Sequence, residues 1–267
     1  MSGHAAPPAK DASLLMASGL SVKFGGLLAL NALDIEVKRG EILGLIGPNG
    51  SGKTTFFNVI SGIYSASSGN VVLDGQDTTT LRPQQIAAHG LARTFQRSRL
   101  CLSLSVFDNL MLGAVRRLNS GLWYNLVRRG QLAADIGSAA KEARELLAIF
   151  NPQLADKLWQ PAISLGMIDR RRLEICRALI GRPKLVLLDE PSAGMTHDET
   201  NQLMSEILEV RRGLGGLTIV MVEHEMGLIE RATDRCVVLN YGKKICEGKY
   251  SQVAADPQVR EAYLGKS

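Results

Sequence analysis

The stretch that decides the fold is Gly47-Pro48-Asn49-Gly50-Ser51-Gly52-Lys53-Thr54. It fits the pattern Gly-x-x-x-x-Gly-Lys-Ser/Thr, in which glycines let successive backbone N–H groups turn inward around phosphate oxygens. Lys53 can reach the β- and γ-phosphates as a point charge, and the Thr54 hydroxyl can ligate Mg²⁺. A β-rich run, Glu41 to Ile46, precedes the loop, and a helix-like stretch, Thr54 to Ile60, follows it. This order of strand, loop and helix predicts a nucleotide-phosphate site.

The chain on either side of this unit predicts an α/β fold with an insertion. Before it, the β-rich runs Leu20 to Phe24 and Ala32 to Val37 indicate a strand-rich front lobe. Between about Arg97 and Ile163, apolar residues recur at helical spacing, so a helical lobe interrupts the sheet. The α/β pattern returns after Arg182-Pro183, and its apolar runs predict parallel strands that are buried on both faces. The apolar runs are Leu185 to Leu188, Leu217 to Val222 and Cys236 to Asn240, and the helix-like stretch Glu199 to Val210 lies between the first two.

Composition limits the class of protein. The 267 residues suit one domain with lobes better than two independent domains. No apolar run approaches the roughly 20 residues of a membrane helix, so any membrane role is expected to be peripheral. The start, Met1 to Asp11, reads as a loose tail and lacks the pattern of a secretory signal.

Charge and cysteine content exclude further classes. Lys and Arg exceed Asp and Glu by 31 to 26, far from the basic footprint of a nucleic-acid binder, so no nucleic-acid partner is expected. The four cysteines, Cys101, Cys176, Cys236 and Cys246, lie far apart, which argues against a disulfide framework and a zinc site. A reducing compartment such as the cytosol fits best.

Two carboxylates end a second predicted strand, Leu185 to Leu188. Ligands bind at the carboxyl ends of strands in open α/β sheets. There Asp189 would hold Mg²⁺, usually through water, and Glu190 would polarise a water for attack on the γ-phosphate. Taken alone, the pair also fits a solvated strand end or a helix cap. The phosphate loop favours the catalytic interpretation.

Two further polar residues follow predicted strands. His224 comes after Leu217 to Val222, where a donor facing the γ-phosphate would stabilise charge that grows as the bond breaks. Gln96 follows the strand-like Leu91 to Phe95 and can contact Mg²⁺ or the attacking water. A lone His is usually not functional, and a lone Gln is usually a surface amide. Their functional interpretation therefore depends only on their positions after predicted strands.

The order of these motifs resembles an ATP-binding cassette over nearly all of the chain after the tail. The segments that carry the resemblance, besides the phosphate loop, are Arg93-Thr94-Phe95-Gln96, Leu173-Glu174-Ile175-Cys176-Arg177-Ala178-Leu179, Asp189-Glu190-Pro191 and Val222-Glu223-His224. Leu239-Asn240-Tyr241-Gly242-Lys243-Lys244-Ile245 and Glu261-Ala262-Tyr263-Leu264-Gly265 further resemble ATPase subunits of branched-chain amino-acid importers. The resemblance implies a P-loop NTPase fold of the α/β class, with a RecA-like, mostly parallel core sheet, an antiparallel β lobe and an inserted helical lobe. Residues 1–12 are then the tail, 13–267 the ATPase domain, and about 97–180 the helical lobe.

The resemblance also implies roles for individual residues. Phe24 stacks on adenine, Gln96 forms the Q-loop, Ser192 to Met195 form the D-loop, and His224 is the switch histidine. The expected catalytic residues are Lys53, Gln96, Glu190 and His224, and the expected Mg²⁺ ligands are Thr54, Gln96 and Asp189. The expected ATP contacts are Phe24, Gly47, Asn49, Gly50, Ser51, Gly52, Lys53, Thr54 and Thr55.

By the same resemblance, the chain energises an importer that it does not itself form. The expected partners are a second ATPase subunit in a head-to-tail dimer, separate transmembrane permease subunits and, indirectly, a substrate-binding protein. Its place is then the cytoplasmic face of the cell membrane. Branched-chain amino acids are the suggested cargo, with other amino acids, amides or urea as alternatives. A soluble cassette of translation or DNA repair usually has two cassettes or a coiled-coil insertion, and this sequence has neither.

The family's signature, Leu-Ser-Gly-Gly-Gln or a near variant, departs from its pattern here. Counting back without gaps from Leu173-Glu174 gives Leu165-Gly166-Met167-Ile168-Asp169, with Gly166 in the place of Ser and Ile168 in the place of Gly. This register predicts a helix that begins near Arg170 and is capped by Asp169, whose charge would disfavour an anion. In the alternative register, Ile163-Ser164-Leu165-Gly166 is the signature, and two inserted residues must be absorbed before the helix.

A signature serves the ATP bound to the opposing subunit. The altered motif therefore favours an asymmetric heterodimer in which this chain's catalytic residues meet an intact signature on the partner. A homodimer would carry the altered signature at both sites and should hydrolyse ATP slowly. A regulatory nucleotide-binding subunit with little turnover is the alternative function.

Three weaker features complete the sequence. Arg170-Arg171-Arg172 is interpreted as a solvated helix face. The stretch 122–129 mixes aromatic and cationic residues and is interpreted as core packing, with a membrane-interface helix as the alternative. The resemblance places Leu104 to Leu112 in the region that docks the permease.

Overall fold

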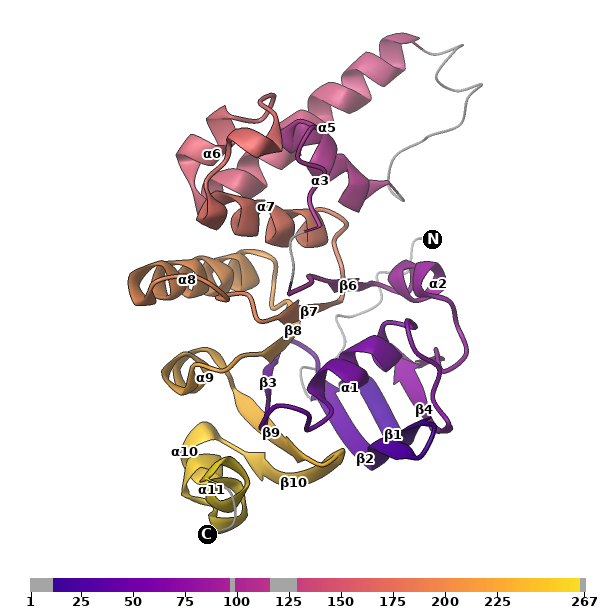
Figure 1. Ribbon diagram of the computed structural model, residues 1–267. Helices are drawn as coiled ribbons and strands as arrows, with labels where there is room; N and C mark the ends of the chain where they lie inside the picture. Colours follow the sequence, from indigo (N-terminus) through magenta and orange to yellow (C-terminus); the bar gives the residue numbers. More distant parts are fainter. Residues whose placement is uncertain (1–11, 97–98, 116–128, 265–267) are drawn as a thin grey trace.

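The computed structural model describes residues 12–96, 99–115 and 129–264 (Figure 1). The strands are β1 (Ser13–Phe24), β2 (Leu27–Lys38), β3 (Ile42–Ile46), β4 (Ser68–Leu73), β5 (Gln76–Asp77), β6 (Leu91–Arg93), β7 (Leu185–Asp189), β8 (Thr218–Val222), β9 (Arg235–Asn240) and β10 (Lys243–Gly248). The helices are α1 (Lys53–Ile60), α2 (Pro83–Ala88), α3 (Val106–Ala114), α5 (Arg129–Phe150), α6 (Pro152–Asp156), the 3₁₀ turn η1 (Ala162–Ser164), α7 (Met167–Leu179), α8 (His197–Gly213), α9 (Met226–Ala232), α10 (Tyr250–Ala255) and α11 (Pro257–Leu264).

The core of the molecule is a six-stranded sheet in the order β10-β9-β3-β8-β7-β6. Its strands are parallel except for β10, which pairs antiparallel with β9. Every residue of β3, β7 and β8 is buried, which explains why these strands read as continuous apolar runs. Because the three strands are parallel neighbours, their carboxyl ends meet at one edge of the sheet, where ligands bind in such folds.

The front lobe is a four-stranded antiparallel sheet in the order β2-β1-β4-β5. Phe24 pairs with Leu27 across the turn, so Gly25-Gly26 breaks the strands where the sequence predicts. Both strands are longer than the predicted runs, because irregular registers let β1 and β2 continue through polar positions. Helix α1 fills the space behind this sheet with the fully buried Phe56 and Phe57.

The predicted helical segment is present as α3, α5, α6 and α7, which lie together at the end of the molecule away from the antiparallel sheet (Figure 1). Leu110, Leu147, Leu154 and Leu173, one from each helix, are fully buried in the same apolar cluster. That cluster continues into the core, so the helices are packed onto it and not merely tethered. The stretch 122–129 falls almost wholly outside the described residues.

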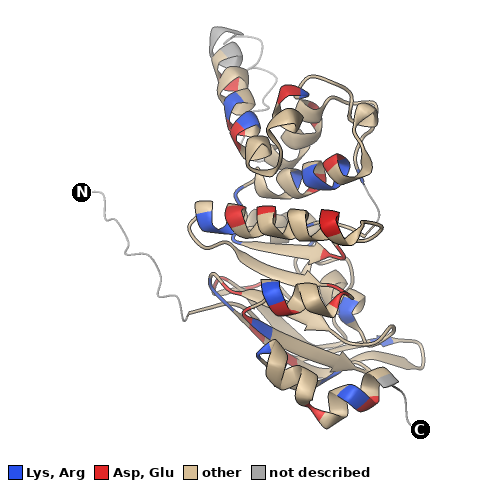
Figure 2. Cartoon of the chain, turned by 90° about the vertical axis from the view of Figure 1, so that its left-hand side faces the viewer, with Lys and Arg blue, Asp and Glu red and all other residues tan. Residues whose placement is uncertain are grey.

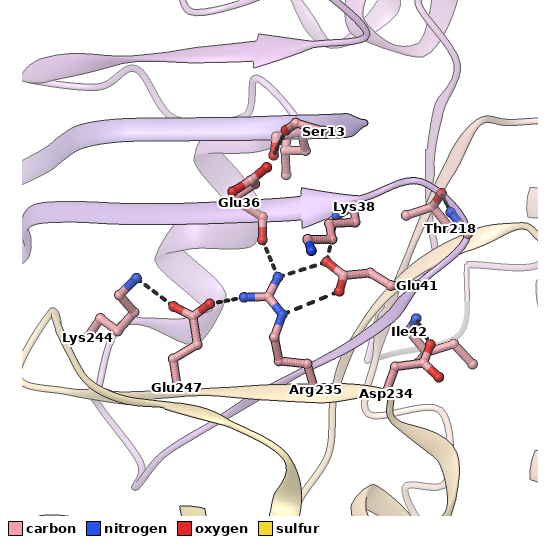
Figure 3. A network of polar contacts seen from close by, with 12 residues as sticks. Ser13, Glu36, Lys38, Glu41, Ile42, Thr218, Asp234, Arg235, Lys244 and Glu247 are labelled. Carbon is pink, nitrogen blue, oxygen red and sulfur yellow. Dashed lines mark hydrogen bonds and ion pairs between the residues drawn. The ribbon is translucent and has the colours of Figure 1, made fainter. Parts of the chain in front are cut away.

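A polar network closes the amino end of the core strands, opposite the ligand edge (Figure 3). Arg235 at the start of β9 donates to the Glu41 carboxylate at 2.8 Å, to the backbone oxygen of Glu36 at 2.6 Å, and pairs with Glu247 of β10. Asp234 accepts the backbone N–H of Ile42 at 2.8 Å. The network joins β2, β3, β9 and β10, and so fixes the strand that delivers the phosphate loop.

Charged residues of both signs lie along the outer helices (Figure 2). Helix α8 carries Asp198 and Glu199 in its first turn and Arg211 and Arg212 in its last, an arrangement that complements the helix dipole. Among the residues described, no helix combines the length and the apolar character needed to cross a membrane.

Candidate nucleotide and catalytic site

The phosphate loop leaves β3 after Ile46 and enters α1 at Lys53. Gly47 has φ 145°, and a Cβ at this position would lie 2.1 Å from the backbone oxygen of Leu239. Only glycine fits there. Gly52 caps α1 with φ 109°, which turns the first N–H groups of the helix toward the loop. The backbone can therefore form the anion cradle that the sequence predicts.

Lys53 lies inside this loop with 6% of its surface exposed. Its Nζ donates to the backbone oxygens of Gly47 at 2.6 Å and Pro48 at 3.0 Å. Burial lowers the pKa of Lys53, and the nearby carboxylates Glu190 and Asp189 oppose that shift. The ammonium is thus held at the centre of the loop and facing the two carboxylates.

Asp189 ends β7, with its side chain fixed by a cation that the sequence reasoning missed. Nη2 of Arg93 lies 2.8 Å from Asp189 Oδ2 in a buried ion pair. Nη1 of Arg93 donates to Asn58 of α1 at 2.7 Å and to Ser61 at 3.1 Å. Arg93 therefore joins the helix of the phosphate loop to the acidic strand end. Arg93 ends β6, which pairs with β7, and this neighbouring strand end is the signal that could have revealed the role.

Glu190 is the centre of the predicted catalytic group. Its Oε2 accepts the Gln96 side-chain amide at 2.6 Å, and its Oε1 lies 2.7 Å from His224 Nε2. The backbone of Glu190 has φ 48°, a left-handed conformation that is uncommon outside glycine. The structure thus brings together three residues that are far apart in the sequence.

A second carboxylate, Glu223, also supports this edge of the sheet, and its role was not predicted from the sequence. It accepts the backbone N–H of Ser192 at 2.9 Å and the Ser192 hydroxyl at 2.7 Å, and so ties β8 to the turn after Glu190. Burial raises the pKa of Glu223, while hydrogen bonds from Ser192 and His224 oppose the shift. Its position between a buried strand and His224 was the available signal.

A cavity of about 350 Å³ opens over these groups. Its lining contains all the predicted ATP contacts except Gly47, together with the predicted catalytic residues Glu190 and His224; these contacts are Phe24, Asn49, Gly50, Ser51, Gly52, Lys53, Thr54 and Thr55. Phe24 lies at its rim, half exposed, with its ring edge-on to Tyr64 at 5.3 Å between centroids. Asp189 and Gln96 are not part of the lining, but Gln96 contacts the lining residue Glu190, and the charge of Asp189 acts on Lys53. Tyr241, 85% exposed, also lines it, although the sequence offered this residue only as part of a resemblance.

The start of α7 corrects the predicted signature geometry. The helix begins at Met167 with Gly166 as its N-cap, not near Arg170, and no side chain caps it. Asp169 instead lies in the first turn, where its carboxylate accepts from Arg172 at 2.9 Å and from Asn151 at 3.2 Å. Its charge is therefore balanced within the chain. Because the helix starts directly after Gly166, no loop remains to absorb two inserted residues, which disfavours the alternative register.

The interpretation of Arg170-Arg171-Arg172 as a solvated face is wrong for two of the three residues. Arg171 is 8% and Arg172 is 4% exposed. Arg172 makes a two-point contact with Glu206 of α8, at 3.0 Å and 2.7 Å. Glu206 comes from a distant segment, which a run of like charges cannot reveal. Glu174, the partner of Arg171, lies only three residues away on the same helix, so for Arg171 a local signal was present in the sequence.

The chain is similar to known proteins over most of its length. A family model described as ABC transporter matches residues 30–193, and one described as branched-chain amino acid ATP-binding cassette transporter matches residues 243–267. The high-affinity branched-chain amino acid transport ATP-binding protein LivG of Escherichia coli (strain K12) is 37% identical over 95% of this chain and 98% of its own length. The corresponding protein BraF of Pseudomonas aeruginosa is 35% identical over the same shares. A nucleotide-free ATP-binding cassette from an ABC transporter superposes with a TM-score of 0.80 at 28% identity, covering 96% of this chain and 100% of that one.

Proposed function

This chain belongs to the ABC transporter family and is an ATPase of that family, and from this premise we propose that it powers the import of branched-chain or related amino acids. The observation that carries the proposal is Glu190, held between Gln96 and His224 at a cavity that also contains Lys53. The relatives LivG and BraF are named for branched-chain amino-acid transport, which supports this cargo. Urea or amides are the alternative cargo.

The residues around the cavity support a division of labour in hydrolysis. The loop N–H groups and Lys53 bind the phosphates, and the exposed face of Phe24 stacks on adenine. Glu190 polarises the attacking water, with Gln96 and His224 fixing the orientation of its carboxylate. His224 also stabilises charge on the γ-phosphate. Each of these steps uses a group that lines the cavity or that contacts a residue of its lining, which supports the proposal.

The donor set fits Mg²⁺, which prefers oxygen ligands beside substrate phosphates. The Thr54 hydroxyl is exposed at the cavity, and Gln96 uses its amide nitrogen toward Glu190, which leaves its oxygen available. Arg93 engages one oxygen of Asp189 and so fixes that carboxylate. Thr54, Gln96 and Asp189 would hold the ion, whose chemistry is to neutralise phosphate charge.

The partners follow from the transporter assignment. Two adjoining cavities, of about 310 and 360 Å³, run between the core and the helices, and both are lined by Arg93, Phe95, Gly113, Arg177 and Ala178. This surface is the proposed dock for a transmembrane permease subunit, and its lining includes Leu112 of the expected docking region Leu104 to Leu112. The chain would then act at the inner face of the membrane. A substrate-binding protein would act from the opposite side.

A second ATPase subunit completes the proposed assembly as an asymmetric heterodimer. Gly166 gives the start of α7 no side-chain hydroxyl, and Ile168 replaces the small residue of the family pattern. The partner's signature would then serve this chain's catalytic group, while the other site turns over slowly. The turn Ser192 to Met195, the D-loop, would lie at the seam. The same alteration favours the second candidate function, a regulatory subunit with little turnover.

ATP hydrolysis by the chain alone, and then in the complete transporter, tests the proposal. We expect activity only in the transporter, and Glu190→Gln in this chain should lower it by at least about a hundredfold. Leucine uptake into vesicles should fall in parallel. Urea uptake should be absent from the wild-type transporter and from the Glu190→Gln transporter. Full activity of the Glu190→Gln transporter would instead identify the chain as the regulatory subunit.

A further inference from the structure

Two buried charged residues of α7 face the segment that carries Gln96. Arg171 and Glu174 lie one turn apart, 8% and 4% exposed, and pair at 3.0 Å. Nη1 of Arg171 donates to the backbone oxygen of Phe95 at 3.1 Å, and Nη2 donates to that of Gln96 at 3.3 Å. The guanidinium thus fixes the backbone of the residue whose side chain contacts Glu190.

The same helix also holds this segment on its far side. The second oxygen of Glu174 accepts the backbone N–H of Arg99 at 2.8 Å, and Arg177 donates to the Arg99 backbone oxygen at 2.8 Å. The Arg99 guanidinium lies over the Phe95 ring, 4.4 Å from its centroid. Backbone groups before and after the Gln96 segment are therefore both bonded to α7.

The geometry of α7 separates this contact from its neighbour. Arg171 and Glu174, at i and i+3, share one helix face, whereas Arg172 is turned by about 100° and pairs with Glu206 of α8. One face therefore anchors the helix, and the next face reaches Gln96. The helix begins at Met167, within two turns of Glu174, so a displacement of its start carries Arg171 with it.

We propose that Arg171 and Glu174 are positioning residues that set the place of Gln96 against Glu190. This inference rests on the proposed role of Gln96 in hydrolysis. Neither residue lines the nucleotide cavity, so the pair acts through the backbone of Gln96 and not on ATP. Through the pair, the orientation of α7 determines whether the Gln96 amide lies within hydrogen-bonding distance of the Glu190 carboxylate.

A double-mutant cycle between Arg171 and Gln96, measured in the complete transporter, tests whether Arg171 acts through Gln96. Arg171→Gln should lower kcat for ATP by roughly tenfold to a hundredfold, because small misplacements of a catalytic group have effects of this size, and should leave KM within about twofold. Arg171→Lys, which keeps one donor, should recover part of the rate. In a Gln96→Ala background, Arg171→Gln should cause no further loss. Glu174→Gln keeps an acceptor for the Arg99 N–H and provides a second, milder route to the same readout.

Arg182→Gln is the matched control, since it removes an arginine that pairs with Glu142 on the exposed surface just after α7, and its kcat should not change. Losses that multiply in the double variant would mean that Arg171 has only a structural role, and would overturn the inference while leaving Gln96 in place. No effect of Gln96→Ala by itself would overturn both the inference and the proposed role of Gln96.

Discussion

Two glycines at opposite ends of the proposed chemistry sit under opposite constraints. Around Gly47 the backbone is crowded, and an added Cβ would lie 2.1 Å from the Leu239 oxygen. At Gly166 an added Cβ meets nothing within 4 Å. The phosphate loop is thus fixed sterically by its own chain, whereas the start of α7 has room for the serine that the family pattern has there. The altered signature is therefore not forced by packing within this chain.

The largest expected effect comes from the crowded glycine. Gly47→Ala must displace the loop or strand β9 at Leu239, so several charge-assisted hydrogen bonds to phosphate are lost together. We expect ATP affinity to fall by at least about a thousandfold, or roughly 4 kcal/mol. Equilibrium binding of a fluorescent ATP analogue measures it. Gly166→Ala is the matched control and should bind ATP as the wild type does; equal losses in both would remove the contrast between the two regions.

The anchoring of α7 gives the next largest effect. Arg172→Met leaves the Glu206 carboxylate buried without its partner, and should lower the free energy of unfolding by about 3 kcal/mol. Arg172→Met combined with Glu206→Leu removes both charges and should recover most of that loss. Urea denaturation measures both variants. If the double variant is no more stable than the single one, the pair is not what holds α7 to α8.

Restoring the signature tests whether the altered residues at the start of α7 limit the rate of ATP hydrolysis. Gly166→Ser with Ile168→Gly rebuilds the family pattern at a helix cost of about 1 kcal/mol. If one site of the heterodimer already works at full rate, a repaired second site can raise transporter ATPase activity by no more than about twofold. Steady-state hydrolysis decides this. A rise of tenfold would show instead that this signature limits the whole assembly, as expected for a homodimer.

The contrast between the two regions also explains what could be predicted from the sequence. Local patterns were sufficient for the phosphate loop, because its spacing, flanking strand and glycines all lie within a dozen residues. The partners of Glu190 and Asp189, and Glu206 as the second partner of Arg172, come from segments far along the chain, and side-chain pairing at such distances leaves no local pattern. Hence the strand ends were predicted correctly, but the burial of Arg171 and Arg172 and the roles of Arg93 and Glu223 were not.

The smallest expected effect concerns Glu223, one of two buried carboxylates that support these regions. Burial raises the pKa of both carboxyls above the usual 4.5, but Glu206 has an arginine partner, whereas Glu223 is held by hydrogen bonds from Ser192 and His224. Its contribution to stability is complete below that value and is lost as pH rises through the folded-state pKa, because the unfolded chain releases the proton first. Wild-type protein should therefore lose stability relative to Glu223→Gln as pH rises from 4.5 toward neutrality. Urea denaturation of both proteins across this range measures the difference, and a constant difference would mean that the hydrogen bonds fully offset burial.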